Sequence, residues 1–128
     1  MPVRMTIGIA GGKVEIAEGV RKGGNVRARG GQRLLWEADA TVTKFALTFT
    51  RIGEGDGAVD SEADWPFIGA TALPNTAVVD EFACAVTKAI KFAGRLAADA
   101  GIFKYSVAAT PAAGGQDLTL DPVIIVDR

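Results

Sequence analysis

The chain has 128 residues, 48% of them hydrophobic and 23% charged, which is the size and composition of one folded domain and excludes disorder of the whole chain. Its 14 basic and 15 acidic residues leave a formal net charge of −1, so no strong field draws it to nucleic acid or to an anionic membrane. It has no histidine, which excludes histidine general bases and every zinc or copper site that requires an imidazole.

The amino terminus and the single cysteine provide information on the cellular location of the protein. Residues 1–10 lack the apolar run of a secretory signal, and no apolar stretch reaches the length that crosses a bilayer. We therefore expect a soluble, cytoplasmic protein without a membrane partner. Cys84 can form no intrachain disulfide, and its apolar neighbours favour a small buried residue over a reactive thiol.

The amino-terminal part is predicted to consist of short strands joined by glycine turns. Apolar and polar residues alternate over residues 3–9, and the Gly11-Gly12 pair suits a tight turn to a second strand around residues 14–16. Residues 21–31 are rich in arginine and glycine. Because they lack the Gly-Lys-Ser/Thr ending of a phosphate loop, we predict a solvated hairpin there, with residues 25–29 as an exposed strand.

Residues 32–37 and 41–52 are the next predicted strands, and the second is the clearest in the chain. Phe45, Leu47 and Phe49 share one face of it, and mostly polar residues occupy the other. Its β-branched and aromatic residues suit a half-buried pleated surface. A loop over residues 53–64 follows.

Residues 79–98 fit two periodicities. Several apolar residues follow helical spacing, whereas the apolar residues at even positions from 82 to 96 follow strand spacing. β-branched residues and Gly94 disfavour a long helix. We therefore favour a strand over about residues 86–97, and one short helix between residues 76 and 92 stays open.

The carboxyl-terminal part ends in two predicted strands. Residues 102–109 alternate, with Phe103, Tyr105 and Val107 on one face. Residues 123–126 are apolar throughout, which is unusual for a strand with one wet side. We therefore predict that a loop or a second subunit covers Val123 and Ile125, and that the protein pairs through an edge strand with another copy or a protein partner.

Several segments resemble parts of the cupredoxin-like β-sandwich proteins and together cover most of the chain loosely. Residues 97–107 resemble the penultimate hairpin of that family, and residues 120–126 resemble its closing strand. Residues 31–36 and 42–49 resemble the pair that precedes the metal site, and Pro66-Phe67 also has a counterpart. The resemblance implies a Greek-key sandwich.

The resemblance does not extend to the copper ligands. Copper-bearing members have a histidine near the position of Lys44 and a cysteine near the position of Val107, followed by a second histidine and often a methionine. None of these is present here, and a blue-copper site needs two imidazoles and a thiolate. We therefore expect no cofactor and no electron transfer.

An acidic loop is the strongest candidate for a ligand site. It holds five carboxylates within eleven residues: Glu54, Asp56, Asp60, Glu62 and Asp64. Calcium takes 6–8 oxygen ligands, which such a loop can supply, but the spacing fails the EF-hand pattern. A solvated loop of mutually repelling carboxylates is the other interpretation.

The aromatic residues allow two further interpretations. They are Trp36, Phe45, Phe49, Phe103 and Tyr105. Lysines and arginines lie near them in the sequence, as on sheets that stack single-stranded nucleic acid. Because most of them share one face of their strands, we favour a place in the core and expect no nucleic-acid partner.

We therefore predict one all-β domain over residues 1–128, a cupredoxin-like Greek-key sandwich of about seven or eight strands. The predicted function is a non-enzymatic binding or assembly module. The alternative is a calcium-binding protein that uses loop 54–64, and a small enzyme using lysine and carboxylates is a less favoured third.

Overall fold

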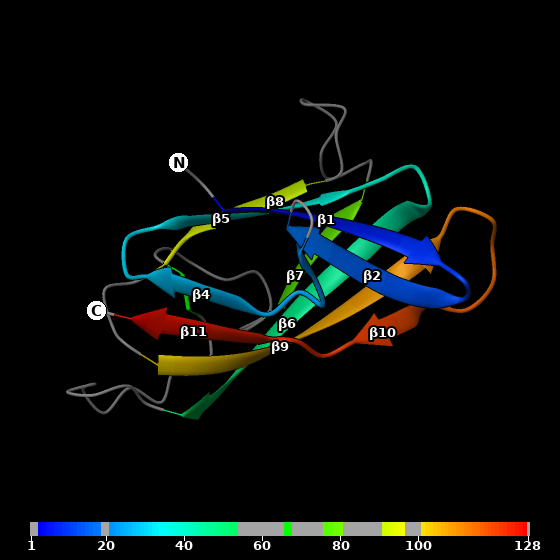
Figure 1. Cartoon of the computed structure of the whole chain (residues 1–128). Helices are drawn as coiled ribbons and strands as arrows, with labels where there is room; N and C mark the ends of the chain where they lie inside the picture. Colours follow the sequence, from blue (N-terminus) through cyan, green and yellow to red (C-terminus); the bar gives the residue numbers. More distant parts are fainter. Residues whose placement is uncertain are drawn as a thin grey trace.

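The computed structural model describes residues 3–18, 21–53, 66–67, 76–80, 91–96 and 101–127. Within these ranges every regular element is a β-strand, and the strands form two sheets packed as a sandwich (Figure 1). The prediction of an all-β sandwich is confirmed. The described ranges hold eleven strands, more than expected. Those at residues 21–22 and 118–120 are too short to show an alternating pattern, and the sequence pattern left residues 76–80 open to a helix.

The first sheet contains five strands in the order β3-β2-β1-β5-β8. Their bounds are Arg21–Lys22 for β3, Lys13–Glu18 for β2, Val3–Ala10 for β1, Arg33–Ala38 for β5 and Lys91–Arg95 for β8. β1 and β5 are parallel, and the other neighbours are antiparallel. The predicted amino-terminal hairpin is confirmed, since Gly11 and Gly12 join β1 to β2 with φ of 59° and 75°.

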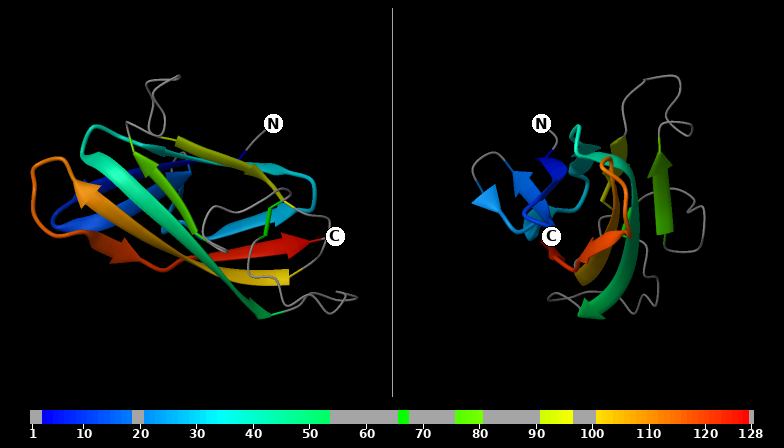
Figure 2. Two further views of the ribbon diagram at one scale, coloured as in Figure 1. Left: turned by 180° about the vertical axis from the view of Figure 1, so that it is seen from behind. Right: turned by 90° about the vertical axis from the view of Figure 1, so that its right-hand side faces the viewer.

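The second sheet has the order β4-β11-β9-β6-β7, and β10 also pairs with β9. The bounds are Val26–Arg29 for β4, Val123–Asp127 for β11, Gly101–Pro111 for β9, Val42–Gly53 for β6, Thr76–Asp80 for β7 and Leu118–Leu120 for β10. Only β4 and β11 are parallel. The side view in Figure 2 shows β1 and β2 on one side of the molecule and β6 on the other.

An aromatic cluster centred on Trp36 of β5 fills the space between the sheets. The Trp36 ring centroid lies 5.3 Å from that of Tyr105, 6.1 Å from that of Phe49 and 6.0 Å from that of Phe67, all edge to face. Such pairs contribute beyond the area they bury. The predicted inward residues of β6 and β9 are all buried: Phe45, Leu47, Phe49, Phe103, Tyr105 and Val107. Alternation along these two strands therefore decides which side chains form the core.

The predicted hairpin over residues 21–31 is wrong. β3 pairs with β2 in the first sheet, whereas β4 pairs with β11 in the second, so the chain crosses between the sheets at this point. Gly23 and Gly24, at φ of 109° and 77°, make the crossing. β4 is also half-buried, because Val26 and Ala28 face the core.

The short helix left open between residues 76 and 92 is not found where the structure describes that range. Residues 76–80 form β7 against β6, and β8 begins at residue 91 against β5. Val78 and Val79 are β-branched, which favours a pleated strand with a partner over a helix. The strand favoured over residues 86–97 is confirmed for residues 91–95, whereas residues 81–90, with Cys84, lie outside the described residues.

No helix long and apolar enough to cross a membrane occurs in the described residues.

Gly94 of β8 supports the aromatic cluster by having no side chain. A Cβ at this position would come within 2.6 Å of the buried Phe67 ring. We expect Gly94→Ala to lower the free energy of unfolding by about 1–3 kcal/mol, because the ring must move within a filled core. Chemical denaturation would measure the loss. Ala93→Ser, at the exposed neighbouring position, is the matched control, and equal stabilities of the two variants would contradict the expectation.

Tyr105 of β9 joins the second sheet to the crossing segment. Its hydroxyl donates a hydrogen bond to the Gly24 carbonyl oxygen and lies 3.9 Å from the Met5 sulfur. Burial of the ring raises the pKa of Tyr105 well above its ordinary value, and the neighbouring Trp36 offsets this only in part. The neutral phenol is therefore part of the folded state.

This raised pKa predicts how stability depends on alkaline pH. Tyr105 in the unfolded chain releases its proton near pH 10. The stability contributed by the neutral phenol is therefore complete below that pH and is lost as the pH rises above it. Because Tyr105 is the sole tyrosine, phenolate absorbance reports on it alone. We expect the absorbance to rise only as the near-ultraviolet circular dichroism is lost, and a phenolate in a still folded protein would refute this.

Candidate functional site

The predicted interface strand β11 lies inside the second sheet. β4 pairs with it on one side and β9 on the other, so this strand is not a sheet edge. The sequence could not show this, because the partner β4 is about a hundred residues away and pairs in parallel. Ile124 and Val126 are buried in the core, whereas Val123 and Ile125 face outward and are half-exposed.

A shallow depression lies beside Val123 and Ile125. It is lined by these two side chains and by Asn25, Val26 and Arg27, and its volume is about 310 Å³. The Asn25 Oδ1 accepts a hydrogen bond of 2.9 Å from the Val123 backbone N–H, which fixes the start of β11. The depression is therefore held in shape by the junction of the crossing segment with the last strand.

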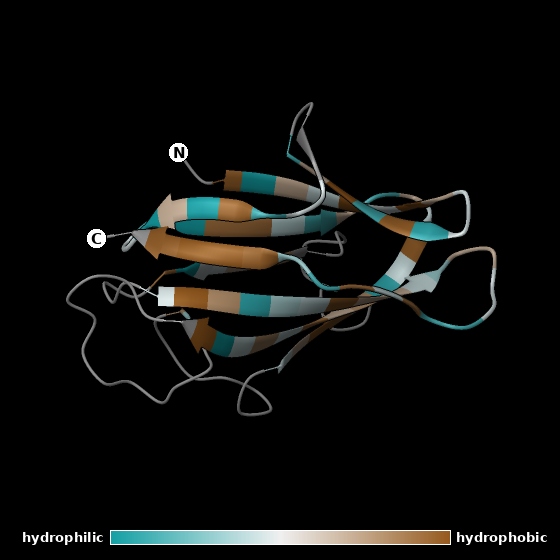
Figure 3. Cartoon of the chain, turned by 60° about the horizontal axis from the view of Figure 1, so that its bottom comes forward, coloured by the Kyte–Doolittle hydropathy of each residue, from teal (hydrophilic) through white to brown (hydrophobic). Residues whose placement is uncertain are grey.

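The apolar surface continues from β11 across the neighbouring strands. Ile125 faces half-buried Ile102 of β9 directly in register. Ile52, at the adjoining end of β6, is 56% exposed, the larger of the two exposed large hydrophobic side chains among the described residues. We call Ile125, Ile102 and Ile52 the isoleucine row. Figure 3 shows β11 brown along its length, whereas β9 beside it alternates between hydrophobic and hydrophilic residues.

Small uncharged side chains cover the middle of the same outer face. They are Ala46, Thr48, Thr76, Ser106, Ala108 and Thr119. The Thr48 and Thr76 hydroxyls lie 3.2 Å apart and hydrogen bond to each other across β6 and β7. Lys104 is a charged exception, and its ammonium lies 3.7 Å from the Asp121 carboxylate. The middle of this face is therefore uncharged apart from Lys104, whereas exposed arginines stand along its edge strand β4, with Arg27 directly opposite Ile125.

The outer face of the first sheet is different. Long charged side chains stand on it, and an ion pair of 3.9 Å joins Arg4 to Glu37. Leu35 faces outward there but is only 9% exposed. Among the described residues, the two exposed large hydrophobic side chains, Ile52 and Val78, both belong to strands of the second sheet.

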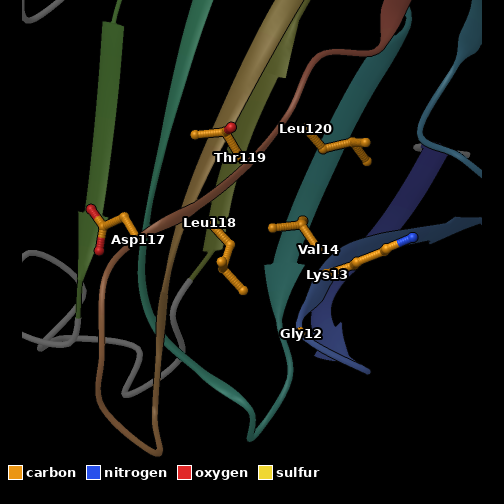
Figure 4. Close-up of a pocket in the computed structure, with 7 residues that line it drawn as sticks. All are labelled: Gly12, Lys13, Val14, Asp117, Leu118, Thr119 and Leu120. Atoms are coloured by element: carbon orange, nitrogen blue, oxygen red, sulfur yellow. The ribbon is translucent and has the colours of Figure 1, made fainter.

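A second depression of about 380 Å³ lies where the edge of the first sheet meets β10 (Figure 4). Val14, Leu118 and Leu120 provide apolar walls, and Lys13 and Asp117 stand at its two sides. The Asp117 carboxylate accepts a hydrogen bond of 2.7 Å from the Thr110 hydroxyl. Leu118 and Leu120 also pack against the core. This depression therefore lies mainly along the junction of the two sheets.

The acidic loop cannot be placed in this arrangement. Glu54, Asp56, Asp60, Glu62 and Asp64 lie outside the described residues, and calcium binding there stays a prediction. Within the ranges that are described, no three cysteine, aspartate or glutamate side chains gather where they could hold a metal ion.

The aromatic side chains lie where the core interpretation predicted. Trp36, Phe45, Phe49 and Tyr105 are 0% exposed and Phe103 is 2% exposed. The Arg51 guanidinium lies over the Phe103 ring, 4.5 Å from its centre. These five rings therefore offer no stacking surface for nucleic-acid bases.

Comparison with known proteins adds no identity: no protein-family model matches the chain, and no curated protein sequence does either.

Proposed function

We propose that this chain is a non-enzymatic assembly module that associates with a second copy of itself through the outer face of the second sheet. The observation that carries the proposal is the contrast between the two outer faces of the sandwich. One bears an ion pair and long charged side chains, and the other bears the isoleucine row beside a group of small uncharged side chains. Removing apolar surface of this kind from water lowers the free energy of the system, which favours association.

Charge also favours a partner of the same sequence. The formal net charge of −1 produces almost no repulsion between two copies as they approach. In an isologous contact, both copies use the same surface patch, so that patch must be complementary to itself. The isoleucine row and the small residues beside it can then pack on themselves, with Arg27 of the edge strand β4 beside the contact.

We further propose that the sandwich is of the cupredoxin-like, Greek-key kind without a copper centre. The strand order supports this, because the segments that resemble the penultimate and closing strands form the neighbours β9 and β11, and the segments around β5 and β6 lie in opposite sheets. The parallel pairs β1–β5 and β4–β11 require connections that pass between the sheets. The missing histidines leave such a sandwich without blue-copper chemistry.

The oligomeric state of matched variants tests the assembly proposal. We expect the wild-type protein to dimerise in a concentration-dependent way. Ile125→Lys should weaken the dimer about tenfold or more, since it places a charge in the apolar contact. Light scattering coupled to size-exclusion chromatography measures both. Because Ile125 faces outward, the variant should still fold, with the far-ultraviolet circular dichroism of the wild type.

Thr6→Lys is the control, because Thr6 is exposed on the outer face of the first sheet. This variant should dimerise as the wild type does. A wild-type protein that stays monomeric at its highest soluble concentration would refute the proposal, and so would equal weakening by both substitutions.

A further inference from the structure

Two arginines stand directly opposite each other on the outer face of the first sheet. Arg33 of β5 is the register partner of Arg95 of β8, and both are exposed (β5 and β8 in Figure 1). The Cβ atoms of two residues that face each other across antiparallel strands lie about 5 Å apart. Like charges at such positions destabilise a sheet. The arrangement therefore carries a free-energy cost that a bound anion would remove.

An ion pair lies near the two arginines, and a hydrogen bond holds one of them in place. Arg4 of β1 lies in the next row, opposite Leu35. Glu37 lies one row further along β5, and its carboxylate is already 3.9 Å from Arg4. The Arg95 Nη1 donates a hydrogen bond of 2.7 Å to the Gly31 carbonyl oxygen, which holds the guanidinium at the end of the sheet.

We propose that Arg33 and Arg95 form a binding site for a tetrahedral oxyanion, a phosphoryl or sulfuryl group of a small molecule. The planar guanidinium presents paired N–H donors that match two oxygens of such a group, and two of them can hold it from both sides. Ala93 lies exposed in the adjoining row of β8, so a small apolar part of the same molecule has a surface beside the anion. The site lies on the face opposite the proposed dimer contact and does not depend on it.

Pyrophosphate is the probe for this site, titrated at constant ionic strength into the full chain. We expect calorimetry to detect binding and thermal unfolding to shift upward with pyrophosphate concentration. Arg33→Gln should weaken binding about tenfold or more. The same variant should be at least as stable as the wild type without pyrophosphate, because it removes the repulsion between the two arginines. A purely structural arginine would give the opposite result.

Two further variants distinguish binding at this site from nonspecific attraction of the anion to positive charge. Arg29→Gln removes one exposed arginine from β4 in the other sheet and should leave pyrophosphate affinity unchanged. Arg33→Lys keeps the charge without the paired donors and should bind less tightly than the wild type. Equal losses in Arg29→Gln and Arg33→Gln would overturn the proposal. An absence of binding to the wild type would also overturn it.

A single-stranded oligonucleotide provides the last comparison. The five rings of Trp36, Phe45, Phe49, Phe103 and Tyr105 are buried, so bases would find no stacking partner among them. We therefore expect the oligonucleotide to bind no more tightly per phosphate than pyrophosphate does. Much tighter binding that Arg33→Gln abolishes would show a nucleic-acid surface in place of a small-molecule site.

Discussion

The closing of two sheets over the Trp36 aromatic cluster is the constraint on which the rest of the structure depends. Trp36 comes from one sheet, and Phe49 and Tyr105 come from the other, so the cluster forms only when the sheets are in place. Interiors of this kind are packed as densely as organic crystals, and a ring cannot be displaced without cost. Gly94 shows how tight the fit is, because Phe67 occupies the space that any larger residue would need.

The same constraint determines what remains outside. Once alternate residues of β6, β9 and β11 are committed to the core, the intervening residues must form the outer face of the second sheet. On β11 those residues are Val123 and Ile125, and the strand remains apolar on the side away from the core. The contrast with the charged outer face of the first sheet therefore follows from the sequence of the outward positions.

The crossing segment between β3 and β4 connects the core to the candidate surface. Tyr105 binds the Gly24 carbonyl from inside the sandwich, and the adjacent Asn25 side chain binds the start of β11. A short run of residues thus positions the buried phenol and the depression beside Val123 together. The glycines in it serve this crossing, in which the backbone adopts positive φ and approaches the tyrosine closely.

The sequence by itself determined the strand class, the hairpin at Gly11-Gly12, and the inward faces of β6 and β9, because alternation and turn chemistry are local properties. It also marked Val123 and Ile125 as unusual outward residues. Only the tertiary structure decided that β4 lies beside β11, that residues 21–31 cross between the sheets, and that Arg33 faces Arg95. These pairings join segments far apart in the chain, and a local pattern carries no information about which distant strand completes a sheet.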